Sequence, residues 1–285
     1  MLKKLLIIVL AILLVIIIPV IYVYIDNHRV KTAVYTYSSE KIPENFDGFK
    51  ICVVTDFHSS INGGKVADAV RNTQPDIICI AGDLVNMNDT DFTNARNLVK
   101  ELCDIGKVYF SYGNHEIWSN SENKTEIPVI KDKLKDLPVT FMNDEVRTIE
   151  KDGQKINLIG YGDDVYDDFD GLFEKQGRKR LTALHKTLDP SVASILVMHR
   201  AQYFKMAAEI GYDVVLSGHL HGGHIGIKKI QSCILKEHFG SDIYSKGEYT
   251  EGDSRMYVSG GLANKNRIPR IFNTPEIMVV ELDAK

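Results

Sequence analysis

The 285-residue sequence predicts an α/β domain that follows a single membrane-spanning helix. Short apolar runs typical of buried strands alternate with helical stripes, several of these runs end in Asp, Asn or His, and a long uncharged apolar run lies near the N-terminus. We expect residues 1–25 to form the anchor, 26–45 a polar spacer, and 46–285 the folded domain.

The anchor prediction rests on the uncharged run from Leu5 to Ile25, which at about 1.5 Å per residue crosses roughly 30 Å of hydrocarbon. A cleaved signal peptide is the alternative, but its apolar region is usually about 7 to 15 residues and ends in small residues. We therefore expect a single-pass protein of the cell membrane. The short tail with Lys3 and Lys4 favours a cytoplasmic N-terminus and an extracytoplasmic domain, although Arg29 and Lys31 balance the charge across the span.

The composition is that of an ordinary globular domain, with 44% hydrophobic and 25% charged residues and a net charge of −4. A chain of this charge is not expected to bind nucleic acid. The four cysteines, Cys52, Cys79, Cys103 and Cys233, show no paired spacing of a zinc site or disulfide framework. The first two lie in strand-like apolar runs, and we expect them to be buried thiols.

In the first half of the domain, each predicted strand is followed by a side chain that can bind metal or move a proton. In chain order these are 51–55 followed by Asp56 and His58, 77–81 followed by Asp83, and 108–111 followed by Asn114 and His115. Helical stripes around 66–70 and 92–102 connect the strands. Ligands of open α/β sheets collect at the carboxyl ends of strands, so we expect these side chains to meet.

The second half repeats this arrangement after a predicted hairpin over 146–159 that turns at Asp152-Gly153. The strand 194–198 ends in His199, and a helix capped by Gly211 leads to the strand 214–216. His219 and His221 follow that strand between glycines, which allow a sharp turn that aims both rings at one place. Alone, they would equally suit a pair of loop histidines. Two further strands are expected over 256–259 and 277–282.

Taken together, the strand ends supply enough oxygen and imidazole ligands for two divalent metal ions with a shared carboxylate. The residues are Asp56, His58, Asp83, Asn114, His199, His219 and His221. Mixed carboxylate, amide and imidazole ligands without thiolate suit Mn, Fe or Zn and disfavour a purely structural zinc site.

These motifs resemble, in order and spacing, the five motifs of the calcineurin-like metallophosphoesterases. They are Asp56-Phe57-His58, Gly82-Asp83, Gly113-Asn114-His115-Glu116, His199 and Gly218-His219-Leu220-His221. The resemblance spans about residues 49–282, and the ending over 258–277 is similar to the membrane-associated bacterial branch that includes the YaeI-type phosphodiesterases. It implies two facing mixed β-sheets flanked by helices.

The resemblance also implies roles for individual residues. One ion would be held by Asp56, His58, Asp83 and His221, and the other by Asp83, Asn114, His199 and His219. Metal-activated hydroxide would attack a phosphomonoester or phosphodiester, with His115 as the general acid. Glu116 would orient its neighbour. Because the anchor keeps the site near the bilayer surface, a lipid-linked phosphate is one candidate substrate.

Two other functions remain open from the sequence. His224 creates a His-x-His-x-x-His string like that of metallo-β-lactamase-type hydrolases, but their pattern needs aspartate where Gly223 stands. Alternatively, the chain is a non-catalytic, membrane-anchored metal-binding scaffold, although such relatives should have lost ligands. Asn86 and Ala201 depart from the family pattern at positions that are not ligands.

Three further segments are expected to form loops. An acidic run formed by Asp163, Asp164, Asp167, Asp168 and Asp170 is predicted to be solvated loop rather than a second metal site. Lys265, Arg267 and Arg270 form either a solvated basic loop or a contact for phosphate headgroups. Residues 234–253 show no sustained period and are predicted to be a mobile flap.

Overall fold

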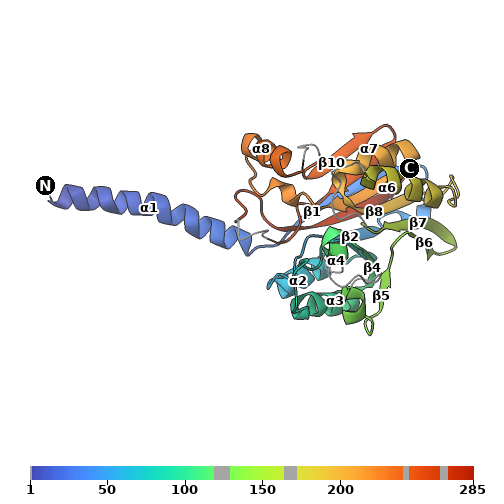
Figure 1. Cartoon of the computed structure of the whole chain (residues 1–285), viewed down its shortest axis with the longest axis horizontal. Coiled ribbons are helices and arrows are strands. Elements are labelled where there is room, and N and C mark those ends of the chain that lie inside the picture. The colour runs from blue at the N-terminus through green and yellow to red at the C-terminus, as the bar shows by residue number, and fades with distance from the viewer. Residues whose placement is uncertain (1, 119–128, 164–171, 240–243, 264–268) are drawn as a thin grey trace.

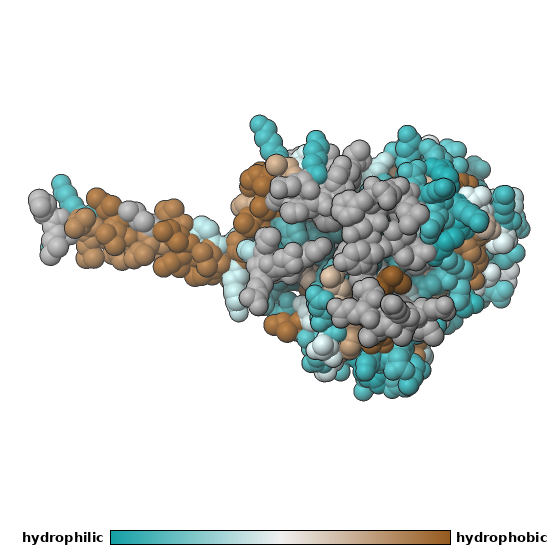
Figure 2. Space-filling model, viewed as in Figure 1, coloured by the Kyte–Doolittle hydropathy of each residue, from teal (hydrophilic) through white to brown (hydrophobic). Residues whose placement is uncertain are grey.

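The computed structural model describes residues 2–118, 129–163, 172–239, 244–263 and 269–285. Figure 1 shows a folded domain from which the first helix, α1 (Leu2–Asn27), projects as a single rod. By length and apolar composition α1 is a candidate membrane span, and the span is not buried against the domain. Its surface is apolar along most of its length, whereas much of the domain surface is hydrophilic (Figure 2).

Two six-stranded sheets form the centre of the domain. The first contains, in spatial order, β1 (Lys31–Ser39), β12 (Glu276–Ala284), β2 (Lys50–Val54), β3 (Ile77–Ala81), β4 (Lys107–Ser111) and β5 (Val139–Phe141). The second contains β10 (Gly247–Glu251), β11 (Ser254–Val258), β9 (Val214–Gly218), β8 (Ser194–Arg200), β7 (Gln154–Tyr161) and β6 (Glu145–Lys151). Strands β2 to β5 are parallel to one another, as are β7, β8, β9 and β11. The antiparallel pairs are β12 with β2 and the two edge hairpins of the second sheet, β6–β7 and β10–β11.

The alternation of side chains along each strand divides the apolar residues among three layers. In β2, Ile51 and Val53 pack between the two sheets, while Cys52 and Val54 face the helices α2 (Gly63–Thr73) and α3 (Thr93–Ile105). On the far side, α6 (Leu172–His185) and α7 (Phe204–Ile210) cover the second sheet. Each aliphatic side chain buried in this way contributes about 1.5–3 kcal/mol. The predicted fold of two facing mixed sheets flanked by helices is therefore confirmed.

The remaining helical segments are short or lie at the edge of the domain. They are η1 (Glu44–Phe46), α4 (Asn114–Trp118), α5 (Val129–Lys133), η2 (Ala201–Tyr203), η3 (His221–Gly223) and α8 (Lys228–Phe239). The hairpin turn at Asp152 and Gly153 is confirmed, with φ of 48° and 78°, as is the helix cap at Gly211, with φ of 110°.

Two sequence-based predictions about local structure are corrected. The spacer expected over 26–45 contains β1, which pairs in parallel with β12 because Tyr35 and Tyr37 face the core between the sheets. In the flap expected over 234–253, the described residues continue α8 to Phe239 and form β10, and Tyr244 packs on Tyr249 with ring centroids 5.0 Å apart. Residues 240–243 lie outside the described part of the chain.

Candidate metal centre

The carboxyl ends of five strands converge where the two sheets face each other. Strands β2, β3 and β4 contribute from the first sheet, and β8 and β9 from the second. All seven residues predicted from the sequence as ligands lie at these ends and are buried. They are Asp56, His58, Asp83, Asn114, His199, His219 and His221, with exposed fractions between 0% and 8%.

Five of these seven residues have left-handed backbone conformations, which L-residues rarely adopt. The φ angles are 53° at Asp56, 47° at His58, 52° at Asp83, 75° at His219 and 49° at His221. Each such residue costs about 1–3 kcal/mol of backbone strain, which the surrounding structure must offset. The turn that this conformation imposes immediately after each strand is what allows neighbouring side chains to converge. Strain of this kind is concentrated at functional sites.

Two glycines allow the strand ends to approach this closely. A Cβ atom at Gly218 would lie 2.2 Å from Thr55 Oγ1 and 2.5 Å from Asp56 Oδ2. A Cβ atom at Gly113 would lie 2.4 Å from Asp83 Oδ1. Any larger residue at either position would therefore displace a carboxylate of the cluster.

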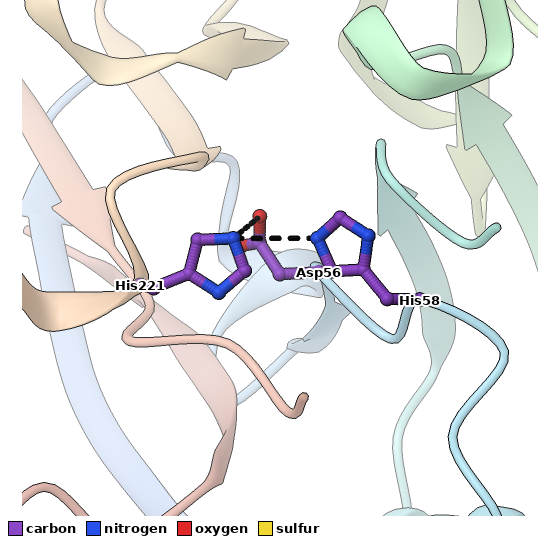
Figure 3. Close-up of side chains that lie close together, drawn as sticks. All are labelled: Asp56, His58 and His221. Atoms are coloured by element: carbon purple, nitrogen blue, oxygen red, sulfur yellow. Dashed lines mark hydrogen bonds and ion pairs between the residues drawn. The ribbon is translucent and has the colours of Figure 1, made fainter. Parts of the chain in front are cut away.

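The first ligand group consists of Asp56, His58 and His221, whose ligand atoms converge on one point (Figure 3). His221 Nε2 lies 3.3 Å from His58 Nε2 and 3.5 Å from Asp56 Oδ1. The Asp56 carboxylate accepts hydrogen bonds from the backbone N–H of His219 and from Thr55 Oγ1, at 3.1 and 3.0 Å to Oδ2. The carboxylate is thus held in one orientation by the protein itself.

The second ligand group consists of Asp83, His199 and His219. His199 Nε2 lies 3.2 Å from Asp83 Oδ2 and 3.2 Å from His219 Nδ1. His199 Nδ1 donates a hydrogen bond of 2.7 Å to the Ala81 carbonyl, because a carbonyl oxygen can only accept. This bond fixes the ring and its tautomer, and the ring turns Nε2 towards the cluster, as is usual for metal-binding histidines.

Asp83 connects the two groups. Its Oδ2 lies 3.2 Å from His199 Nε2 in the second group and 3.7 Å from His58 Nε2 in the first. Asn114 lies beside it at the start of α4, and the buried Asn114 Oδ1 has no hydrogen-bond partner among the described residues. Imidazole nitrogens and carboxylate oxygens that face one another at these distances fit two divalent cations with Asp83 between them.

The electrostatics of the buried cluster support this fit. Burial raises the pKa of Asp56 to about 6, although His199 acts in the opposite direction. Burial also disfavours the charged form of the Asp83 carboxylate. The nearby His199, His115 and His58 outweigh this effect and hold the pKa of Asp83 well below its usual range. Burial lowers the pKa of His199, yet the Asp83 carboxylate raises it to about 10. Buried carboxylates this close together require compensating positive charge, which bound cations supply.

His115 is adjacent to Asn114 in sequence and faces the same cluster. Its Nδ1 accepts a hydrogen bond of 3.1 Å from the Met87 backbone N–H, so in the neutral ring the proton is on Nε2. Nε2 lies 3.9 Å from Asp83 Oδ2, and the ring stands edge-on to His58 with centroids 4.6 Å apart. The arrangement therefore directs an N–H group of His115 into the site.

Glu116 is fully buried and organises the backbone around the cluster. Its carboxylate accepts hydrogen bonds from the N–H groups of Asp83, Leu84, Val85 and Gly113 at 2.7–3.2 Å. Burial raises its pKa to about 7, and the neighbouring Asp83 charge adds to this, while the backbone N–H groups oppose the rise. Glu116 thus fixes the turns that carry Asp83 and Asn114.

Two residues that support the site were not recognised from the sequence as doing so. Arg270, predicted to be in a basic surface loop, is fully buried and donates hydrogen bonds to the carbonyls of Gly260, Ala263 and His221. Burial lowers the pKa of Arg270 to about 10, so the side chain stays charged at neutral pH. Asn273 Nδ2 donates a hydrogen bond of 2.8 Å to the same His221 carbonyl.

The other sequence-predicted residues are placed as follows. Asp163 is buried and pairs with Arg200 rather than lying in a solvated loop, because Arg200 at the end of β8 would otherwise be an uncompensated buried charge. Asp164, Asp167, Asp168, Asp170, Lys265 and Arg267 lie outside the described residues. His224 stacks on His221, with centroids 5.2 Å apart, but belongs to none of the three groups of described residues that could hold a metal ion. The third of these groups combines His58 and Asp83 with His115.

The chain is similar to proteins of one family. A family model described as calcineurin-like phosphoesterase matches residues 49–223. The uncharacterized metallophosphoesterase YkuE of Bacillus subtilis is 28% identical over 92% of this chain and 88% of its own. A zebrafish (Danio rerio) "transmembrane protein with metallophosphoesterase domain" is 22% identical over 85% of this chain and 55% of its own. Among solved structures, the phosphopantetheinyl hydrolase of Mycobacterium tuberculosis matches with a TM-score of 0.46 and 13% identity, over 76% of this chain and 91% of that one.

Proposed function

Because the chain belongs to the calcineurin-like phosphoesterase family, we propose that it is a membrane-anchored phosphoester hydrolase that uses two divalent metal ions. The observation that supports this most strongly is the pair of converging ligand groups that Asp83 connects. A phosphoester is the substrate class that the family implies.

In this proposal Asp56, His58, Asp83 and His221 hold one ion. Asp83, Asn114, His199 and His219 hold the other, so that Asp83 bridges the pair. Mn, Fe and Zn all suit this donor set. When bound, two such ions activate water for in-line attack and neutralise charge on the phosphoryl oxygens.

His115 is the proposed general acid. The Met87 N–H at its Nδ1 keeps the transferable proton on Nε2, which faces the ligand cluster. A leaving alkoxide oxygen that departs next to Asp83 would receive this proton. A positioned acid of this kind contributes about 10²–10⁴ in rate.

The proposal extends to the membrane anchor and to the substrate. We assign α1 as an uncleaved single-pass anchor, with the N-terminus in the cytoplasm, the domain outside, and membership of the branch that includes the YaeI-type phosphodiesterases. An anchored site favours phosphoesters at the bilayer surface, including lipid-linked phosphates. Protease added to intact cells tests the orientation, because an extracytoplasmic domain is digested while a cytoplasmic one is protected.

An assay of the full-length protein separates the enzyme from a non-catalytic scaffold. The purified protein, loaded with Mn²⁺, Fe²⁺ or Zn²⁺, is incubated with p-nitrophenyl phosphate and bis-p-nitrophenyl phosphate. We expect metal-dependent release of p-nitrophenol that chelation abolishes and metal restores. A protein that binds two ions per chain but hydrolyses neither these esters nor lipid phosphates with any metal would be a scaffold.

A further inference from the structure

An exposed apolar surface of the domain adjoins the end of α1. Among the described residues outside α1, the large hydrophobic side chains that are exposed are Val34, Ile61, Ile227, Ile230 and Phe272. Phe272 contacts Tyr22 of α1, with ring centroids 5.9 Å apart. In Figure 2 the hydrophobic surface of α1 is followed by hydrophobic surface on the adjacent edge of the domain, where α8 lies.

Ile227, Ile230 and Phe272 belong to two segments that run side by side. The Gly226 N–H donates to the Ile271 carbonyl at 2.7 Å, and the Ile271 N–H donates to the His224 carbonyl at 3.1 Å. A Cβ atom at Gly226 would lie 2.0 Å from the Phe272 carbonyl oxygen, so the backbones are in direct contact. The three exposed side chains therefore come from adjoining stretches of the chain, and we call them together the α8 patch.

The length of α1 places this patch at the depth of the bilayer surface. The apolar run begins at Leu5, and about 30 Å of hydrocarbon at about 1.5 Å per residue ends near Tyr22 to Ile25. Phe272, in ring contact with Tyr22, then lies at the boundary between hydrocarbon and headgroups. Aromatic side chains are enriched at that boundary.

The end of α1 is fixed to the domain rather than joined by a flexible linker. Asn27 Nδ2 donates to the Arg270 carbonyl at 2.7 Å, and the Arg270 N–H donates to Asn27 Oδ1 at 2.8 Å. Thr274 Oγ1 donates to Asp26 Oδ1 at 2.8 Å. These bonds hold the α8 patch at a constant position relative to the anchor.

Basic residues lie beside the carboxyl end of α1. Arg29, Lys31 and Lys65 line a cleft of about 550 Å³ together with Asp26 and Asp68. Arg29 and Lys65 are exposed, and Lys65 Nζ contacts the His28 carbonyl that follows the helix. Cations beside an apolar surface suit a bilayer with anionic headgroups better than they suit an apolar protein face.

We propose that the α8 patch is a second membrane contact, and that it seats the metal centre against the bilayer so that phosphoesters of membrane lipids are its substrates. The inference rests on the proposed function and names its substrate class. The same two segments support His221, since Gln231 of α8 donates to the Gly222 carbonyl at 2.6 Å and Asn273 donates to the His221 carbonyl. The bilayer contact and the predicted ligand turn are therefore one structural unit.

Depth-dependent fluorescence quenching tests the contact without using activity. The full-length protein, with Cys103→Ser and Cys233→Ser to remove the accessible thiols, receives Ile230→Cys, Phe272→Cys or, as the control, Val34→Cys. Val34 is 62% exposed and Phe272 61%, but Val34 lies on β1. Each protein is labelled with an environment-sensitive fluorophore and reconstituted in phosphatidylcholine–phosphatidylglycerol vesicles that carry a nitroxide lipid.

We expect labels at 230 and 272 to shift to the blue and to be quenched several-fold more than the label at 34. Quenching equal to that at 34 would overturn the membrane contact. A blue shift without quenching would also overturn it, because a second protein surface and not lipid would then cover the patch.

Activity in the same vesicles tests the substrate class. For Ile230→Ser/Phe272→Ser we expect the ratio of the rate on a vesicle-borne lipid phosphate to the rate on soluble p-nitrophenyl phosphate to fall several-fold, while Val34→Ser keeps the parental ratio. An unchanged ratio in the double variant would overturn the lipid assignment. If no variant hydrolyses either ester with any metal, the proposed function fails, and the quenching result still decides the contact.

Discussion

The two ligand groups of the candidate metal centre are held by different parts of the molecule. The second group depends on bonds in the domain core, such as that from His199 of β8 to the Ala81 carbonyl of β3 in the other sheet, and that from the Asp83 backbone N–H to Glu116 of α4. In the first group, the turn that carries His221 is supported by Arg270 and Asn273, from a loop that is bonded to the end of α1. The comparison indicates that one group is built into the core, while the other is coupled to α1, the proposed anchor.

The largest effect is expected from replacing Asp83, the residue that both groups share. Asp83→Asn takes one charge from both proposed coordination spheres, so we expect bound metal to fall from two ions per chain towards zero and hydrolysis to become undetectable. Metal content is measured by mass spectrometry after dialysis. Retention of two tightly bound ions in this variant would show that the groups do not share Asp83.

A second variant separates metal binding from proton transfer. His115→Ala should leave two ions bound, because His115 is outside the proposed ligand set. The rate on esters with a basic leaving group should fall about 10²–10⁴-fold, while p-nitrophenyl esters, whose leaving oxyanion needs no proton, change little. Metal loss, or equal impairment for every leaving group, would exclude the general-acid role.

The variant with the smallest expected effect distinguishes the two groups by their affinities for metal. Asn273→Ala removes a support of the His221 turn, so we expect about tenfold weaker binding of one ion and unchanged binding of the other. Competition with a chelator resolves the two affinities. Asn45→Ala is the matched control, since Asn45 also donates its amide to a backbone carbonyl, that of Asp152, but on an exposed surface. If both affinities weakened together, the groups would not be independently supported.

The sequence predicted the parts of the site that follow buried strands. Short apolar runs that end in Asp, Asn or His indicate both the strand and the position of its last side chains, because the carboxyl ends of parallel strands lie at one edge of a sheet. The glycines around His219 and His221 also indicated the turn that the structure contains.

The sequence did not reveal the supports that come from residues distant in the chain. Arg270 and Asn273 lie in a short irregular segment whose composition resembles a solvated loop, and only the fold places them under the His221 turn. The same is true of β1, where the alternation of Ala33, Tyr35 and Tyr37 was a weak strand signal. The sequence contains no periodic pattern that would predict the burial of Arg270 or the ion pair between Asp163 and Arg200.

The central claim is that Asp83 joins two metal ions into one centre, and electron paramagnetic resonance of the Mn²⁺-loaded full-length protein tests it most directly. Two ions that share a carboxylate are magnetically coupled, so we predict the multiline spectrum of an exchange-coupled pair at two Mn²⁺ per chain. The uncoupled six-line spectrum of isolated Mn²⁺, at the same loading, would contradict the account.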